Sequence, residues 1–525
     1  MFDRTADVAN EHKKSIHEQT RNSFVSVRVF SWIAFSARKQ QLRDPSHEGL
    51  TGRNGPSYTM ESNLDKPALQ RRLLALLFIL AVAFAVRGLT MRFIRDHLSD
   101  PGWFQSGSYA IFDRQAQNIL DGKASIFWID DPAKTEAAVY PPGYPIWLSL
   151  IYKISGERSA AATQRVQWIL DSLSVLLVIG IGVTAYNWRV GLTAGFLAAL
   201  SPLLALSGAT PMADAPTSWI VLIGVWMLLL AFRRQRLGWA IGAGLAVGSS
   251  CWLRPNAQLL VFCWVAALLV LLNPGWRRRL LFSAAVILGM AILVAPLLIR
   301  NAIAFRAFVP TGLGTGTNLW EGIGETERAA EFGAFVDDKD VVEQERKEMG
   351  VPADAPFGLY FPDGVKRDRQ RARKALAVIA RNPVWHAGVM ARRMAGMLKY
   401  AGHPPRFMGS AGINVTSEKT LPTRVWGGPL ACAVNVLGMM QSVLRWVLLP
   451  LIVVGLFLGF RRDAKITGLL LATVLYYLVV SSFLHSELRY ALPMHALLHI
   501  WAAVALTSLA TIFQIRFRNR KLVKA

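Results

Sequence analysis

Cysteine is almost absent from this chain of 525 residues, which contains only Cys251, Cys263 and Cys432. None belongs to a CxxC pair or to a cluster with histidines, so the sequence has neither the ligand spacing of a zinc site nor a disulfide framework. We expect each cysteine to act as a small buried hydrophobic side chain. The sequence therefore predicts no cofactor and supports no metal, although a divalent ion is left open.

Charged residues are missing from three long stretches, 73–86, 190–212 and 446–460. Lipid favours such surfaces, because each charge at the centre of a bilayer opposes insertion by a few kcal/mol. The formal net charge of +24 would suggest nucleic-acid binding in a soluble protein. Here the basic residues gather at the ends of apolar blocks, which indicates a membrane protein and argues against nucleic acid.

The N-terminus is not expected to be a signal peptide. Residues 1–65 are polar and of mixed charge, and we expect a disordered cytoplasmic tail. Met60 shortly precedes Arg71 and Arg72 and the first apolar run, so two interpretations stay open. Either the tail is genuine, or translation starts at Met60.

Ten apolar runs approach the roughly 20 residues that a membrane-spanning helix needs. An eleventh, Tyr144–Ile154, is too short and is expected to be an interfacial helix. The prediction is an all-α polytopic membrane protein with about ten transmembrane helices plus juxtamembrane helices. The ten runs are 72–92, 164–186, 190–208, 213–232, 237–253, 256–273, 279–299, 441–460, 466–484 and 491–513.

Lys and Arg in the short loops predict the orientation, because they accumulate on the cytoplasmic side. Ten spans place both termini inside and leave two large outer loops, 93–143 and 301–440. The transmembrane core is then 66–300, and 441–525 holds the last helices and a basic tail. Three arginines at the outer end of the first helix oppose the rule: Arg87, Arg92 and Arg95. Within the second loop, Arg367–Met397 is expected to be a helix on the membrane surface.

Several short motifs occur in an order that resembles the GT-C superfamily of integral-membrane glycosyltransferases. The resemblance is to the branch with protein O-mannosyltransferases, aminoarabinose transferases and RgtA/B/C/D-like enzymes, and it covers about 70–515. The motifs are AQNILDG at 116–122, YPPGYP at 140–145, SP at 201–202 with ADA at 213–215, LRPN at 253–256, IRN at 299–301, FVP at 308–310, NLW at 318–320 and LRY with LP at 488–493.

The resemblance implies transfer of a sugar from a polyprenyl-phosphate carrier to an acceptor on the outer face, with inversion at the anomeric carbon. The family's base is an acidic residue in the first outer loop, at the position that Ser108 occupies here. This departure leaves the base open among Asp113, Asp100 and Asp131. The alternatives for Asp113 are a pairing with Arg114 or a local capping role, and for Asp100 a turn role. Asp131 and the adjacent Asp130 could instead bind a metal or form a solvated turn.

Arginines in the outer turns are candidates for binding the donor phosphate, since a guanidinium can hold phosphate oxygens in a bidentate manner. They are Arg489, Arg254 and Arg445; Glu487 is an alternative partner for Arg489. Pocket candidates are Asp214, Tyr140, Tyr144 and His485. For Asp214 the alternative is a helix N-cap. Asp171 lies within a span, where an acid is either functional or hydrogen-bonded to neighbouring helices.

The expected partners are a polyprenyl-phosphate-linked sugar donor, a lipid, glycan or protein acceptor, and membrane lipid. The expected location is a cell inner (plasma) membrane, with the active site facing the periplasm. The main alternative is a multi-pass transporter or lipid-carrier flippase, although no internal repeat supports two similar halves. A glycosyltransferase-like chain that has lost activity is a third reading, for which Ser108 is the main support.

Overall fold

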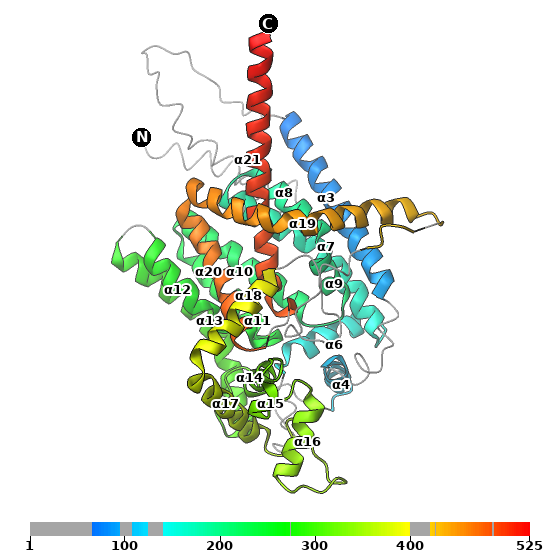
Figure 1. The fold of residues 1–525 in the computed structure, drawn as a ribbon, viewed down its shortest axis with the longest axis vertical. Coiled ribbons are helices and arrows are strands. Elements are labelled where there is room, and N and C mark those ends of the chain that lie inside the picture. Colours follow the sequence, from blue (N-terminus) through cyan, green and yellow to red (C-terminus); the bar gives the residue numbers. More distant parts are fainter. Residues whose placement is uncertain are drawn as a thin grey trace. The chain divides into compact units, whose positions relative to one another are not determined.

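The computed structural model describes residues 66–94, 108–123, 140–272, 275–398, 421–425, 427–485 and 488–524. Contacts divide the chain into Met1–Ala75 and Leu76–Ala525, and the following account concerns the second unit. Its described residues form helices joined by turns, with one isolated bridge between Gly358 and Phe361 in place of any sheet (Figure 1). The predicted all-α polytopic membrane fold is confirmed.

Seven helices in the described residues are long and apolar enough to cross a membrane, or eight if one bent pair counts as a span. The bent pair is α8 (Trp188–Leu200) and α9 (Pro202–Ala209), which meet at 59° where Pro202 begins the second helix. The seven are α3 (Lys66–Ile94), α7 (Ala160–Ala185), α10 (Asp214–Arg234), α13 (Trp276–Phe305), α19 (Ala431–Arg462), α20 (Ala464–Phe483) and α21 (Leu492–Lys524).

The two remaining predicted spans are helical but short. They are α11 (Leu237–Leu253) and the pair formed by η4 (Pro255–Ala257) and α12 (Leu260–Leu271). A 17-residue helix such as α11 rises only about 26 Å at 1.5 Å per residue, less than the ~30 Å of a typical hydrocarbon core. Each predicted apolar run is thus a helix, while length alone qualifies fewer of them as spans.

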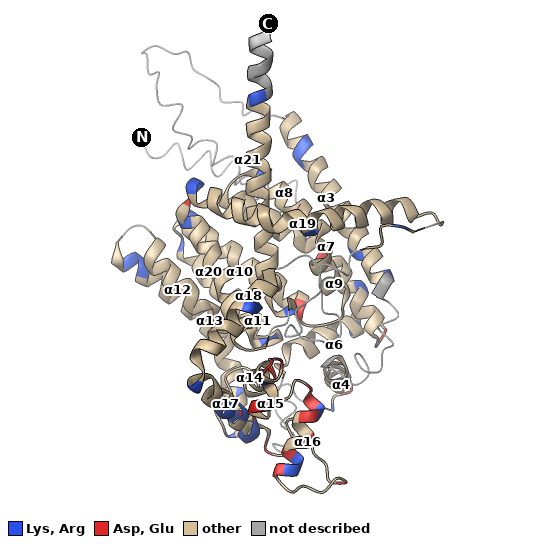
Figure 2. Ribbon diagram, viewed as in Figure 1, with Lys and Arg blue, Asp and Glu red and all other residues tan. Residues whose placement is uncertain are grey.

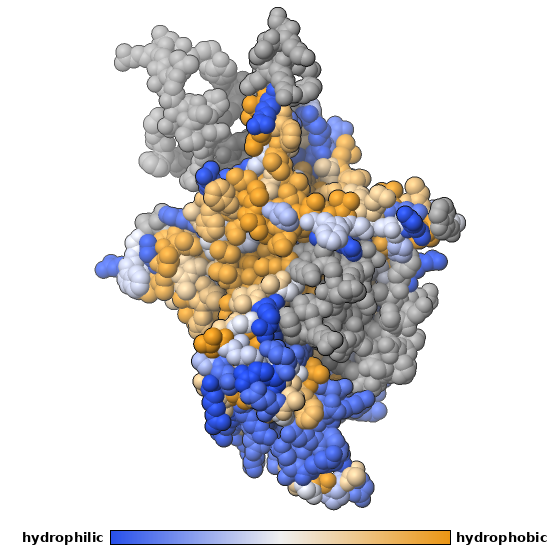
Figure 3. Space-filling view, viewed as in Figure 1, coloured by the Kyte–Doolittle hydropathy of each residue, from blue (hydrophilic) through white to orange (hydrophobic). Residues whose placement is uncertain are grey.

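Small residues let these helices pack closely. A Cβ on Gly244 of α11 would lie 2.0 Å from the carbonyl oxygen of Val286, and one on Gly289 of α13 would lie 2.1 Å from that of Ile241. The backbones therefore touch directly, which is how membrane helices gain dispersion energy without a hydrophobic driving force. Apolar side chains cover the membrane helices on the face seen in Figure 3, while hydrophilic residues cover α16 and α17.

Shorter helices cap this bundle. The interfacial helix predicted at 144–154 is α6, which ends at Gly156 with φ 72°. The stretch predicted as one helix from Arg367 to Met397 is two, because a proline at 383 disfavours helical backbone in the residue before it. These shorter helices are α4 (Ser108–Leu120), α6 (Gly143–Ser155), α14 (Thr315–Gly324), α15 (Ala329–Phe332), α16 (Asp338–Glu348), α17 (Gly364–Arg381), α18 (Pro383–Leu398) and η5 (Leu488–Ala491).

Candidate functional site

The site is organised by the turn that precedes α6. Gly143, the first residue of α6 directly after this turn, lies against the end of α11, and a Cβ there would be 2.4 Å from the carbonyl oxygen of Trp252. Only glycine permits so close an approach of the two backbones. The turn is therefore fixed beside Arg254, the residue that ends α11.

Aromatic packing joins α4 and α6 to the ends of α10 and α11. The ring of Phe112 in α4 lies 4.7 Å from that of Tyr140 and 4.9 Å from that of Tyr144. The same apolar cluster includes Ala213 and Leu253, the residues directly before Asp214 and Arg254. The cluster thus places α4, the turn and the two charged residues in one region.

Asp214 and Arg254 form a buried ion pair. Arg254 Nε lies 3.1 Å from Asp214 Oδ1, and the two side chains are only 11% and 3% exposed. Asp214 is the first residue of α10 rather than its N-cap, which is Ala213. The alternative prediction, that Asp214 is the N-cap of α10, is therefore wrong. Its carboxylate instead pairs with Arg254, in the turn after α11.

Two arginines meet at one tyrosine. The guanidinium carbons of Arg254 and Arg489 lie 5.0 and 5.3 Å from the centre of the Tyr490 ring. The Asn256 side-chain amide donates to the Tyr490 carbonyl at 3.2 Å, which ties η4 to η5 across 234 residues of sequence. The two turns predicted to bind phosphate are therefore adjacent. One follows α11 and contains Arg254, and the other precedes α21 and contains Arg489.

His485 connects this region to the segment that follows α14. Its Nδ1 lies 2.9 Å from Glu325 Oε1, and its ring centre is 6.5 Å from that of Tyr490. Glu325 also pairs with Arg393 of α18 at 3.3 Å. Glu325 belongs to no recognised sequence motif, and only the fold brings it to His485.

A second carboxyl group of α14 is buried in the same region. Glu321 is 8% exposed, and its carboxyl is hydrogen-bonded to that of Asp338 at the start of α16. Burial, followed by the neighbouring Asp338, raises the pKa of Glu321 well above its ordinary value. The pair therefore retains a proton at pH values where an exposed glutamate would have lost it.

Asp113, the leading candidate for the base, is held by neutral donors. Tyr152 OH donates to Oδ1 at 2.6 Å and the Gln117 amide donates to Oδ2 at 2.7 Å. Tyr109 OH lies 2.8 Å from Tyr152 OH, and burial raises the pKa of Tyr109 to about 12. Both phenols therefore stay protonated at neutral pH. Within the described part of the chain, the alternative pairing of Asp113 with Arg114 is not formed.

Several other predicted residues do not join this group. Asp100, Asp131 and Glu487 lie outside the described residues. Arg445 lies in the middle of α19 rather than at the start of a span, and it lines a small pocket with Gln441 and His499. Among the residues that the structure describes, no group of three or more His, Cys, Asp or Glu is placed to hold a metal ion.

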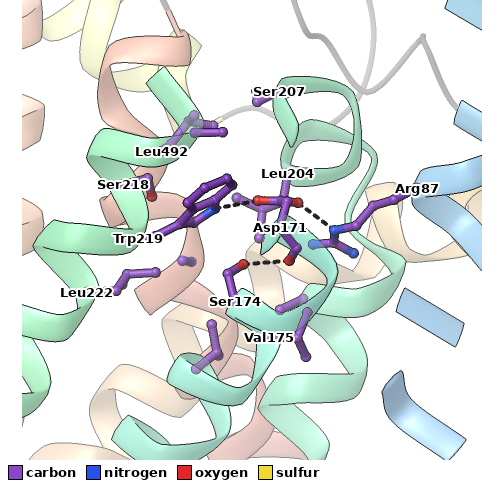
Figure 4. A pocket seen from close by; sticks show the side chains of 14 residues that line it. Arg87, Asp171, Ser174, Val175, Leu204, Ser207, Ser218, Trp219, Leu222 and Leu492 are labelled. Atoms are coloured by element: carbon purple, nitrogen blue, oxygen red, sulfur yellow. Dashed lines mark hydrogen bonds and ion pairs between the residues drawn. The ribbon is translucent and has the colours of Figure 1, made fainter. Parts of the chain in front are cut away.

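The intramembrane Asp171 belongs to a separate arrangement (Figure 4). Arg87 Nε approaches one carboxylate oxygen at 2.5 Å, and Trp219 Nε1 donates to the other at 2.7 Å. The pair borders a cavity of about 10 Å³, room for about one water, whose lining includes none of the residues predicted for the outer site. Asp171 and Arg87 therefore compensate each other, which explains one of the three arginines that opposed the charge rule.

Residues 139–299 match the profile of the dolichyl-phosphate-mannose-protein mannosyltransferase family. The resemblance to the GT-C superfamily is thereby confirmed. The matched segment contains the Tyr140–Tyr144 turn, Asp214 and Arg254, and it ends before Arg489 and His485. No curated protein matches the chain.

Three solved structures are similar at low identity. The apo oligosaccharyltransferase of Archaeoglobus fulgidus has 14% identity and a TM-score of 0.48, covering 86% of this chain and 52% of that one. The AglB oligosaccharyltransferase of the same organism, in complex with an inhibitory peptide and a dolichol-phosphate, has 14% identity and a TM-score of 0.46, covering 85% and 52%. ArnT from Cupriavidus metallidurans, bound to undecaprenyl phosphate, has 16% identity and a TM-score of 0.34, covering 83% and 77%. The chain spans about half the length of the archaeal enzyme, and these similarities are too weak to support an inference about function.

Proposed function

We propose that this protein is a membrane glycosyltransferase that moves a sugar from a polyprenyl-phosphate-linked donor to an acceptor on the outer face of a cell inner membrane. The observation that carries the proposal is the meeting of Arg254 and Arg489 at Tyr490, beside the buried Asp214. Two guanidinium groups at the ends of apolar helices suit the phosphate of a lipid, whose chain stays in the bilayer. The family match over 139–299 includes one of the two arginines.

The chemistry assigned to these residues is a single displacement. An acceptor hydroxyl attacks the anomeric carbon and gives its proton to a carboxylate, the bond from that carbon to the phosphate oxygen breaks, and the configuration inverts. Arg254 and Arg489 stabilise the negative charge that develops on the departing phosphate. Asp113 is the proposed base, because Tyr152 and Gln117 orient both of its oxygens.

Other assignments complete the proposal. Tyr140 and Tyr144, whose rings pack against Phe112, are assigned to the binding of the sugar. His485 faces Tyr490 and is oriented by Glu325. Asp100 and Asp131 remain rival bases, and Arg445 remains a second candidate for the phosphate. The acceptor is a lipid, a glycan or a protein.

The test is a transfer assay in proteoliposomes with labelled polyprenyl-phosphate sugars, comparing the parent chain with Asp113→Asn. Loss of a general base lowers the rate by about 10²- to 10⁴-fold. Asp121→Asn is the matched control, because it removes the same charge at the other end of α4, where Asp121 is paired with Arg158 at the surface. Equal loss in both variants would refute a specific role for Asp113, and absence of transfer by the parent from every donor would favour the transporter.

A further inference from the structure

Helix α17 carries its cations on two faces with different roles. On the inner face Arg367 and Arg371 both pair with Glu345 of α16, at 2.5 and 2.7 Å, and each side chain is 2% exposed. Asp368 accepts the backbone N–H of Thr317 at 3.0 Å. These contacts fix the inner face of α17 against α14 and α16.

The outer face of α17 is basic. Lys366, Arg369, Arg373 and Arg381 are exposed, whereas the single acid of the helix, Asp368, is buried. Lys374 is the one member of this side that pairs with a carboxylate in the described residues, Glu348 at 3.1 Å. Figure 2 shows the resulting concentration of Lys and Arg at α17.

Two contacts fix the hairpin of α17 and α18 to the ends of candidate membrane spans. Arg369 donates to the carbonyl of Phe308, three residues beyond the end of α13. Arg393 of α18 donates to the carbonyls of Ser482 and Leu484, at 3.0 and 2.9 Å, where α20 ends. Because α13 and α20 are both candidate membrane spans, these contacts hold the hairpin at the ends of two such helices.

Large apolar side chains are exposed around the same face. Val384 is 85% exposed, Phe308 71% and Leu376 46%. Exposed apolar side chains next to unpaired cations are typical of helices that lie among lipid headgroups, with the apolar groups in the acyl boundary. A soluble polyanion would account for the cations but not for these apolar side chains.

We propose that the outer face of α17, with Val384 and Phe308, docks onto the anionic lipid headgroups of the leaflet in which α13 and α20 end. The face points away from the candidate site, because the opposite side of α17 contacts α14, which carries Glu321. The docking is therefore independent of the proposed transfer reaction. It anchors the second outer loop to the membrane by charge and apolar contact together.

The test uses the full chain in nanodiscs of phosphatidylcholine, with or without a minor share of phosphatidylglycerol. A fluorophore on Val384→Cys, with the three native cysteines replaced, reports contact through quenching by nitroxide-labelled lipid. Met349→Cys on the exposed end of α16 is the reference position. We expect strong quenching at position 384 in the anionic discs, weaker quenching in the zwitterionic discs, and little at position 349 in either.

The charge requirement is tested with the double variant Lys366→Gln and Arg373→Gln, whose side chains are exposed. Each cation near an anionic surface favours docking about fivefold, so the ratio of docked to undocked helix should fall about 25-fold. Lys339→Gln with Lys347→Gln removes two exposed cations from α16 and should leave quenching unchanged. Equal quenching in both kinds of disc, no quenching in either, or equal loss in the two double variants would overturn the proposal.

Discussion

The buried pair of Asp214 and Arg254 allows two roles of Arg254 to be tested separately. One role is structural, the balance of the Asp214 charge, and the other is the proposed binding of the donor phosphate. Arg254 is 11% exposed and Asp214 3% exposed, so removing either partner leaves the other charge buried without compensation. Breaking such a pair costs about 3–5 kcal/mol. We therefore expect Asp214→Asn and Arg254→Gln each to lower the free energy of unfolding by about that amount.

The double variant Asp214→Asn with Arg254→Gln removes both charges and leaves an amide pair of similar size. Because contacting residues couple by about 0.5–3 kcal/mol, the double variant should be more stable than the sum of the single losses predicts. Unfolding by sodium dodecyl sulfate in mixed micelles measures all four chains of this cycle. Additive losses, or single variants as stable as the parent, would refute the interpretation of a buried ion pair.

The same four chains then test the phosphate role. If Arg254 serves only to balance Asp214, the double variant recovers transfer together with stability. If Arg254 also holds the donor phosphate beside Arg489, as proposed, the double variant regains stability and stays inactive. Recovery of transfer in the double variant would therefore remove Arg254 from the proposed phosphate site.

Three further predictions follow from the site. Gly143→Ala should lower the free energy of unfolding by about 1–3 kcal/mol and reduce transfer, because its Cβ would lie 2.4 Å from the Trp252 carbonyl oxygen. Thermal unfolding and transfer rates measure the two effects. A variant as stable and active as the parent would contradict the close approach of the two backbones. Tyr152→Phe removes a hydrogen bond to a carboxylate, worth about 1.5–3 kcal/mol, so transfer should fall about 10- to 150-fold while a Tyr186→Phe control stays active. Since the pKa of Glu321 is raised in the fold, the folded chain binds the extra proton; stability should fall as pH rises from 4.5 through the raised pKa, and Glu321→Gln should abolish that slope in a pH series of unfolding measurements.

Much of the fold could be predicted from the sequence, because apolar residues favour the lipid interior and charged residues oppose entry into it. The apolar runs, bounded by Lys and Arg, therefore mark the helices. The short helix after Pro142 was predicted within one residue at each end. The number of helices long enough to span a membrane could not be predicted in the same way. Helices α11 and α12 are short, and the break at Pro202 bends α8 against α9. Hydropathy reports where the chain is apolar, whereas length and bend depend on packing against neighbouring helices.

The candidate site was predictable only where a motif marks it. Arg254 and Arg489 stood out because each is a cation in a short turn, and the structure brings both to Tyr490. Glu325 carries no such signal, since its partners Arg393 and His485 lie 68 and 160 residues away and only tertiary contacts unite them. Asp113 could be identified from its position near the expected base. Tyr152, which donates a hydrogen bond to it, could not, because the two residues lie 39 positions apart in the sequence.

Arg87 and Asp171 show why charge rules in membrane proteins need partners as well as positions. Each residue is unusual alone. Arg87 is a cation at the end of the first helix that the charge rule predicts to be outside, and Asp171 is an acid within a span. Together they form a 2.5 Å pair, completed by Trp219, and a Cβ on Gly208 would lie 2.3 Å from the same carboxylate. A buried pair costs less than the sum of two buried charges, so Asp171 of α7 lowers the cost of burying Arg87 of α3. Asp214 and Arg254 form a second buried pair, but there Arg489 adds a second cation at the same tyrosine, Tyr490, and this concentration of positive charge is the basis of the proposed phosphate site.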